Sequence, residues 1–450
     1  MRAGQAATSG GRYHDGEPLL RLALERFTTA QDQAGADRAI TALGTNLIEA
    51  ARMTDAIELL EPVVAGIENF GQRPDLIAAG GQLARAHMLQ IESDRAIAAA
   101  DRVLPAAEHA DMGTLVADLL VTKGTALSMA RRHREGLALI GAGRELGESL
   151  GAHSVTLRAL MNQAFSLEWI SPREAYEGSR KGLTLGRQVG HRGFVMNSLF
   201  NAIFGAIHVG EWDWAAGELV SLLDEELDAA DKPLAAGAVA TFRAVRGEAR
   251  QDVLDEVKGF DSKEVAVRQV IEGVMAYDAL AEGRLDEARN RFEISRRTSL
   301  AFDDFMWTAR IPTWQRDESA LAAALEAMHE AGRHGETAHT LRLTIEAGLS
   351  ALRGSTDEAL HLYRQARDGW DALGLRWDVA LLGMDMAVVL DHAVPEVAEA
   401  IARSRATLTE LGARPFLERL EAEVERNGTV ATPSEQAEPI AMAETEVTAG

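Results

Sequence analysis

The chain has 450 residues, of which 46% are hydrophobic and 26% charged, so it is long and apolar enough to bury a sizeable core. It lacks both an apolar run of the roughly 18 residues that cross a bilayer and an N-terminal secretory segment, so we expect a cytoplasmic protein without a membrane partner. The formal net charge of −23 with scattered arginines argues against direct nucleic-acid binding, and the absence of cysteine excludes disulfides, thiolate zinc sites and cysteine nucleophiles.

Similar segments recur along the chain, and each predicts one helix of a helical hairpin. Each segment has apolar residues at helical spacing around one small residue. These small residues are Ala56, Ala96, Gly136, Ala175, Ala215, Ala288, Ala359 and Ala398. Their successive gaps are 40, 40, 39, 40, 73, 71 and 39 residues, and the two long gaps span two units each, with weak intermediates near Leu254 and Ala324. With one more unit at Pro18, the chain is predicted to hold about eleven units of roughly 38 residues.

A second small residue is expected about twelve positions earlier, where the two helices of a hairpin cross closely. Five units have one, and Gln163, Ile203 and Met386 break the rule in three others. The five residues that fit are Gly44, Ala84, Gly124, Ala276 and Ala347. No segment alternates with a period of two, so the predicted fold is all-α: a right-handed superhelical solenoid of stacked antiparallel helix pairs over residues 1–426, followed by a disordered acidic tail over 427–450.

A glycine recurs where units are expected to join. It follows the small residue by about fifteen positions, where a helix can end in a left-handed turn. These glycines are Gly71, Gly151, Gly190, Gly374 and Gly412. A basic residue stands two positions later each time, and we expect it to bond to the last carbonyls of the preceding helix or to lie over the next repeat. These basic residues are Arg73, His153, Arg192, Arg376 and Arg414.

Two units resemble the tetratricopeptide repeat family. "GRLDEARNRF" (283–292) and "GSTDEALHLY" (354–363) contain that family's Gly-x-x-Asp-Glu-Ala-x-x-x-(Phe/Tyr) core. The longer unit is similar to the expanded repeats in the C-terminal halves of bacterial signal-transduction ATPases, including adenylate-cyclase-like ATPases and LuxR-type regulators. Residues 2–24 resemble the start of such arrays, and residues 410–428 resemble their last helix.

The resemblance implies a non-catalytic scaffold that binds a protein, a peptide or a small effector in the concave groove of the array. The alternative is an effector-sensing regulatory segment of an ATP-dependent transcriptional regulator or of an adenylate-cyclase-like ATPase. The chain contains no Gly-x-x-x-x-Gly-Lys-Ser/Thr motif and no basic residue after Arg426, so the phosphate-binding loop and a DNA-reading helix are absent from it. We expect no cofactor, and the sequence does not predict an oligomeric state.

Aromatic residues concentrate in two segments, 194–214 and 302–314. Counting from Ala215, three residues of the first segment fall on positions that line the groove in tetratricopeptide arrays: Asn197, Asn201 and Phe204. The resemblance implies that they hold a peptide, with Trp307 and Arg310 of the second segment as further candidates. The alternative role of these aromatics is core packing, because Ile203 replaces the usual small residue.

Other polar clusters have simpler interpretations. His329, His334 and His339 are five residues apart, a spacing that fits solvated loop residues better than a helical metal site. "RRHRE" (131–135) is predicted to be a solvated turn, with an acidic partner as the alternative. "LLDEELDAAD" (222–231) lacks the ligand pattern of a calcium loop and is predicted to be a charged helix end. Asp303 and Asp304 have no accompanying nucleophile, so nothing supports an enzyme.

Overall fold

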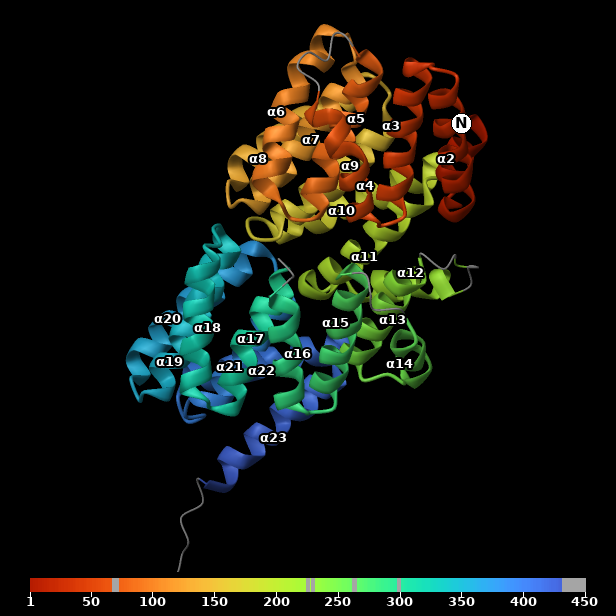
Figure 1. Ribbon diagram of the computed structural model, residues 1–450. Helices are drawn as coiled ribbons and strands as arrows, with labels where there is room; N and C mark the ends of the chain where they lie inside the picture. Colours follow the sequence, from red (N-terminus) through yellow and green to blue (C-terminus); the bar gives the residue numbers. More distant parts are fainter. Residues whose placement is uncertain (67–72, 224–226, 228–230, 261–264, 298–300, 431–450) are drawn as a thin grey trace, which may run out of the picture.

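The computed structural model describes residues 1–66, 73–223, 227, 231–260, 265–297 and 301–430, and these residues form helices without a strand (Figure 1). Gly71, most of the segment 222–231 and residues 431–450 of the predicted tail lie outside the described residues. The last helix ends at Val430, so it continues past the predicted boundary at residue 426.

The described helices form eleven antiparallel pairs and a twelfth first helix, α23, as the repeat spacing predicts. Every predicted small residue lies in the second helix of a pair, including the weak units at Leu254 and Ala324. A short 3-10 helix, η2 (Pro74–Leu76), precedes α5. The pairs are α1 (Arg2–Ser9) with α2 (Tyr13–Thr29), α3 (Gln33–Glu49) with α4 (Met53–Ala65), α5 (Ile77–Leu89) with α6 (Ser93–His109), α7 (Gly113–Met129) with α8 (His133–Ser149), α9 (His153–Leu167) with α10 (Pro172–Val189), α11 (Arg192–Val209) with α12 (Trp212–Leu223), α13 (Lys232–Arg246) with α14 (Gln251–Lys258), α15 (Val265–Ala281) with α16 (Leu285–Arg296), α17 (Phe302–Gln315) with α18 (Glu318–Ala331), α19 (Glu336–Leu352) with α20 (Thr356–Leu373), and α21 (Arg376–Val389) with α22 (Pro395–Leu411), followed by α23 (Arg414–Val430).

The first helices of the pairs form an inner layer. Most of them pack against the first helix of the next pair, as α3 does on α5, α5 on α7 and α7 on α9, whereas second helices pack on first helices instead. An array curves toward the side on which its helices are closer together, so the first helices line the concave face.

Close helix crossings explain the small residues. Between α7 and α8, a Cβ on Gly124 would lie 2.6 Å from the carbonyl oxygen of Gly136, so the two backbones touch, as the spacing predicts. The prediction for the last pair is wrong: Ala398 is exposed, and the close crossing joins Gly383 of α21 to the backbone of Ala400 in α22. This register differs because α21 ends in an extended residue, Leu390, and α22 begins only at Pro395.

The left-handed turns between pairs are confirmed. Gly190 ends α10 with φ +73°, and the described glycines at 151, 374 and 412 also have positive φ. Two of the basic residues that follow these glycines bind partners in other helix pairs and not the last carbonyls of the preceding helix. Arg192 forms an ion pair with Asp231 at 2.7 Å, and Arg414 donates to the carbonyl oxygen of Gly247 at 2.6 Å.

The array completes a superhelical turn every five pairs. Helix α11 of the sixth pair packs on α21 of the eleventh, and α13 packs on α23. At four positions an arginine lies against a left-handed glycine that ends a helix five pairs away: Arg131 with Gly332, Arg173 with Gly374, Arg376 with Gly210, and Arg414 with Gly247. We call α1–α10 the first turn and α11–α23 the second turn, the upper and lower parts of Figure 1.

The two turns have different interiors. Buried apolar residues of the second turn form one continuous core that extends back to Leu183, Tyr176 and Trp169 at α10, whereas the other residues of the first turn divide into smaller clusters between neighbouring pairs. In the second turn α17 and α11 pack against α21, so first helices fill the interior. No helix from another part of the described chain packs over the inner faces of α3, α5 and α7.

Candidate functional site

Four successive inner helices, the last three of the first turn and the first of the second, each carry a polar side chain in a regular row. Gln82, Thr122, Asn162 and Asn201 occupy α5, α7, α9 and α11, and successive members are 40, 40 and 39 residues apart. Because each unit repeats the same geometry, this spacing places them at equivalent positions on four successive inner helices. We call these four residues the polar ladder.

Two ladder residues have a buried polar atom with an unmet hydrogen bond. The Oε1 of Gln82 and the Nδ2 of Asn162 have no partner, and Asn162 is 8% exposed. Thr122 is fully buried, and its hydroxyl donates to the carbonyl oxygen of Asp118 one turn earlier. A buried polar atom without a partner costs about 1–3 kcal/mol, so this face of the array is unusually receptive to a group that supplies the missing partners.

Arg158, beside Asn162 on α9, has further hydrogen-bond donors without a partner. Its guanidinium donates to the hydroxyl of Thr122 at 2.8 Å and forms an ion pair with Asp118 at 2.8 Å. Its Nε and Nη1 atoms have no partner, although the side chain is 4% exposed. Burial lowers the pKa of Arg158, and the nearby carboxylate of Asp118 opposes that shift. Two N–H donors of a buried cation therefore lack acceptor oxygens.

A second ion pair crosses the same face. Arg85 of α5 lies 2.8 Å from Glu49 of α3, and both side chains are partly exposed, at 20% and 33%. Their charges act on Arg158, so the three groups lie near one another across α3, α5 and α9. The inner face of the first turn is thus polar, partly solvated and close to neutral in charge.

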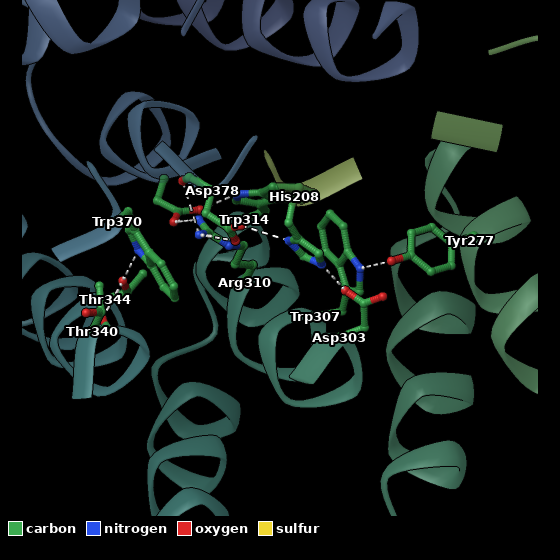
Figure 2. A network of polar contacts seen from close by, with 11 residues as sticks. His208, Tyr277, Asp303, Trp307, Arg310, Trp314, Thr340, Thr344, Trp370 and Asp378 are labelled. Atoms are coloured by element: carbon green, nitrogen blue, oxygen red, sulfur yellow. Dashed lines mark hydrogen bonds and ion pairs between the residues drawn. The ribbon is translucent and has the colours of Figure 1, made fainter. Parts of the chain in front are cut away.

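The second turn places two of the predicted binding residues in its core. Trp307 and Arg310 of α17 are 0% and 1% exposed. The Trp307 indole donates to the Tyr277 hydroxyl at 3.0 Å (Figure 2). Arg310 forms an ion pair with Asp385 of α21 at 2.5 Å. Neither side chain has surface to offer a ligand in this conformation, because α21 covers the inner face of α17.

The three predicted residues on α11 are more accessible. Asn197 is exposed and donates to the carbonyl oxygen of Gly193 in its own helix at 2.9 Å. Asn201 and Phe204 are partly buried, and the Phe204 ring lies 4.7 Å from Phe200 and 6.4 Å from Tyr277. Tyr277 connects Phe204 to Trp307, so the structure brings those two together only through a third ring. Asn197 and Asn201 are not joined to Arg310, and ligand binding by these five residues remains a prediction.

A charged network closes the second turn. His208 of α11 lies 2.8 Å from Asp378 of α21 through Nδ1 and 2.7 Å from Asp303 of α17 through Nε2 (Figure 2). Burial would lower the pKa of His208, but the two carboxylates raise it to about 10, so the imidazole donates to both as a cation. Burial also raises the pKa of Asp385 to about 6, against the opposing effects of Arg310 and Trp314.

This network has the geometry of a structural clamp. Both ring nitrogens of His208 are engaged by carboxylates, which leaves no lone pair for a substrate or a metal. Among the described residues, no three His, Asp or Glu side chains are arranged to hold a metal ion. Within the same residues, no helix is long and apolar enough to span a membrane.

Sequence reasoning missed the most informative residues of both interiors. The polar ladder has a signal in the sequence, because its members repeat at the period of the array. Arg158 has no such signal in the sequence beyond its place four residues before Asn162. The partners His208 and Asp378 are 170 residues apart, and only the closure of the second turn brings them together.

The chain matches no protein-family model, and no curated protein sequence is significantly similar to it. Among solved structures, a Rap protein complexed with Competence and Sporulation Factor is similar over 88% of this chain and 99% of its own, with 12% identity and a TM-score of 0.36. Yeast Tom70 is similar over 96% of this chain and 98% of its own, with 12% identity and a TM-score of 0.28. A circular tandem repeat protein is similar over 95% of this chain and 96% of its own, with 15% identity and a TM-score of 0.17. Likeness at this level carries no argument about function, so the fold rests on this chain's own helix pairs.

Proposed function

We propose that the chain is a non-catalytic binding scaffold, and that the inner face of its first turn binds an extended peptide segment of a partner protein. The observation that carries this proposal is the polar ladder with its unmet hydrogen bonds at Gln82 and Asn162, next to the unpaired N–H groups of Arg158. Amide and guanidinium groups in a row suit a peptide backbone, which offers an N–H and a carbonyl at every residue.

The dimensions of the ladder suit a short extended segment. Neighbouring packed helices lie about 8–10 Å apart, so the three steps from α5 to α11 span roughly 25–30 Å. An extended chain rises about 3.3 Å per residue, so about eight or nine residues cover the ladder. A folded partner would need to present such a segment, because the side chains to be satisfied are mostly buried.

The first turn is the better half for this role because its interior is open to polar groups. In the second turn, α21 already covers α17 and α11, and its carboxylates pair with Arg310 and His208, although the Nε of Arg310 lacks a partner there as well. In the first turn, no helix from another part of the described chain covers Gln82, Asn162 and Arg158, and each of them has an atom without a partner. Peptide binding there removes a cost that the folded protein already carries, so it needs no rearrangement of the closed core.

The test is binding of the purified full chain to an array of random nine-residue peptides, followed by affinity measurement on the peptides that bind. Asn162→Ala and Gln82→Ala are each expected to weaken binding about tenfold, since each removes a hydrogen bond made in a desolvated site. Asn290→Ala changes the same residue type at an exposed position of the outer helix α16 and is expected to bind like the unsubstituted chain.

The same assay separates this placement from the one predicted on α11 and α17. Loss of binding in Phe204→Ala, with Asn162→Ala unaffected, would move the site to the second turn. Unchanged affinity in a Gln82→Ala, Asn162→Ala double variant that keeps its helical circular dichroism would overturn the proposal.

A further inference from the structure

The corner between α9 and α10 joins the two turns. Trp169 follows α9 and is 2% exposed, yet it belongs to the continuous core of the second turn. Its ring packs edge-on against Phe302 at 5.6 Å and Phe305 at 5.3 Å, both in the first helical turns of α17. The Arg333 guanidinium lies 5.3 Å from the centre of the Trp169 ring.

The backbone also approaches closely at this corner. Gly335, in the loop between α18 and α19, has φ +113° and touches the backbone carbonyl of Trp169, so a side chain at residue 335 would collide with it. Beyond the corner, α7–α10 meet α17–α20 through Arg173, which donates to the carbonyl oxygen of Gly374 at 3.0 Å, and through Arg131 at Gly332. In the described chain, no helix from α7 to α10 packs lengthwise on a helix from α17 to α20, whereas α10 packs along α11. The contact of α7–α10 with α17–α20 therefore depends on Trp169 and a few helix ends.

A buried carboxyl group lies beside Trp169 in the same corner. Glu168 is partly buried, and its Oε2 is enclosed without a hydrogen-bond partner, while the carboxyl group accepts a hydrogen bond from the backbone N–H of Phe302. The charged groups that face it are Asp303 of α17, His208 of α11 and Arg333 of the loop after α18. Arg333 in turn faces His133 of α8, whose ring nitrogens are both buried without a partner. Burial raises the pKa of Glu168 to about 7 and Asp303 adds to that shift, whereas the Phe302 N–H, His208 and Arg333 oppose it.

We propose that the corner formed by Glu168 and Trp169 is a proton-operated latch, which holds the α9–α10 corner against α17 and the loop after α18 when Glu168 is protonated and loosens this contact when it is ionised. Docking places the carboxyl group in a buried site next to Asp303, where a negative charge is poorly solvated. Undocking returns that group to water. The latch does not depend on the proposed peptide binding, although α9 carries ladder residues and would move with the corner.

The direction of the pH effect follows from linkage. A carboxyl whose pKa is raised in the docked state binds a proton more tightly there, so protons favour docking. The docked state therefore weakens as pH rises from about 4.5 to about 7, and the effect levels off above that range. Between pH 5.5 and pH 8.0, the ratio of undocked to docked protein is expected to rise on the order of tenfold.

The absence of native cysteine permits a direct distance measurement. Cysteines replace two exposed residues, Glu177→Cys on α10 and Glu358→Cys on α20, and carry spin labels whose separation is measured by pulsed electron paramagnetic resonance. The full chain is expected to show a narrow distance distribution at pH 5.5 and an added longer component at pH 8.0. The isosteric variant Glu168→Gln is expected to stay narrow at both pH values, and Trp169→Ala is expected to show the longer component at both.

Trp214→Ala is the matched control, because that tryptophan of α12 also packs under an arginine, Arg180 of α10, but has no ring contact with α17. It is expected to keep the pH response of the unsubstituted chain. A Glu168→Gln variant that widens with pH as the unsubstituted chain does would overturn the proposal, and so would an unchanged distribution in folded Trp169→Ala. If Trp169→Ala loses its helical circular dichroism, the comparison of Glu168→Gln with the unsubstituted chain decides alone.

Discussion

The Nδ1 of His208 lies 2.8 Å from a carboxylate oxygen of Asp378, although 170 residues separate the two in the chain. His208 belongs to the sixth helix pair and Asp378 to the eleventh. The contact therefore records the closure of one superhelical turn, and it accounts for the filled interior of the second turn.

Breaking this ion pair is expected to destabilise the fold strongly. In Asp378→Asn, the cationic His208 loses a buried counter-charge, and the free energy of unfolding should fall by about 3 kcal/mol. Urea denaturation followed by circular dichroism measures the change. Asp357→Asn, at an exposed position of α20, is expected to stay within about 0.5 kcal/mol of the unsubstituted chain. Equal losses in the two variants would contradict the role given to Asp378.

The stability of the chain should depend on pH through His208. Its pKa is raised from 6.5 to about 10, so its contribution is complete below pH 6.5 and is lost as pH rises toward 10. Over that window the free energy of unfolding is expected to fall by up to about 4 kcal/mol more in the unsubstituted chain than in His208→Gln. Urea midpoints at pH 6, 8 and 9.5 test this, and parallel pH profiles for the two proteins would show that His208 is not the source.

Replacement of two glycines in the α10 region by alanine is expected to change the stability of the chain in opposite directions. Gly190 has φ +73°, so Gly190→Ala places a β-carbon in a left-handed turn and should cost about 1 kcal/mol, although no atom lies near the new carbon. Gly178 lies within α10 with open space around it, so Gly178→Ala should stabilise by about 0.5–1 kcal/mol. Thermal melts of both variants give the comparison, and shifts of the same sign would argue against a left-handed requirement at residue 190.

The crossing of α7 and α8 should not tolerate a larger residue. A β-carbon on Gly124 would lie 2.6 Å from the Gly136 carbonyl oxygen and 2.8 Å from the side chain of Ile140. Gly124→Ala is therefore expected to cost about 2 kcal/mol through displacement of the two helices. Gly141→Ala, on α8 with nothing within 4 Å, is its control and should not destabilise the chain. Similar urea midpoints for the two variants would contradict the close crossing.

The helix pairs could be predicted because their signal is local and repeated. A small residue about every 40 positions, with apolar neighbours at helical spacing, places every unit in the second helix of a pair, and the seven small residues from Ala56 to Ala359 are buried there. The register failed at Ala398, where an extended residue after α21 delays the start of α22. That delay depends on a loop, and loops do not follow the period of the array.

The interior could not be predicted in the same way. Trp307 and Arg310 occupy positions that face a groove in an open array, but in this chain α21 packs over them. Arg310 and Asp385 are 75 residues apart, and their contact depends on how tightly the superhelix winds. No single repeat displays that pitch, because it is the sum of small rotations between neighbouring pairs.

Contacts between pairs five units apart constrain the number of pairs that the array can have. In four contacts, an arginine is five pairs from the left-handed glycine that it lies against, as Arg376 is from Gly210 and Arg414 from Gly247. Deleting one internal unit, such as α13 and α14, would offset the later arginines by a whole unit from the helix ends that they cover. The pairs before α7 form none of these four contacts, so units can be removed or added at that end without disturbing the count. The number of helix pairs can therefore change before α7 without breaking these contacts, but not between α7 and α23.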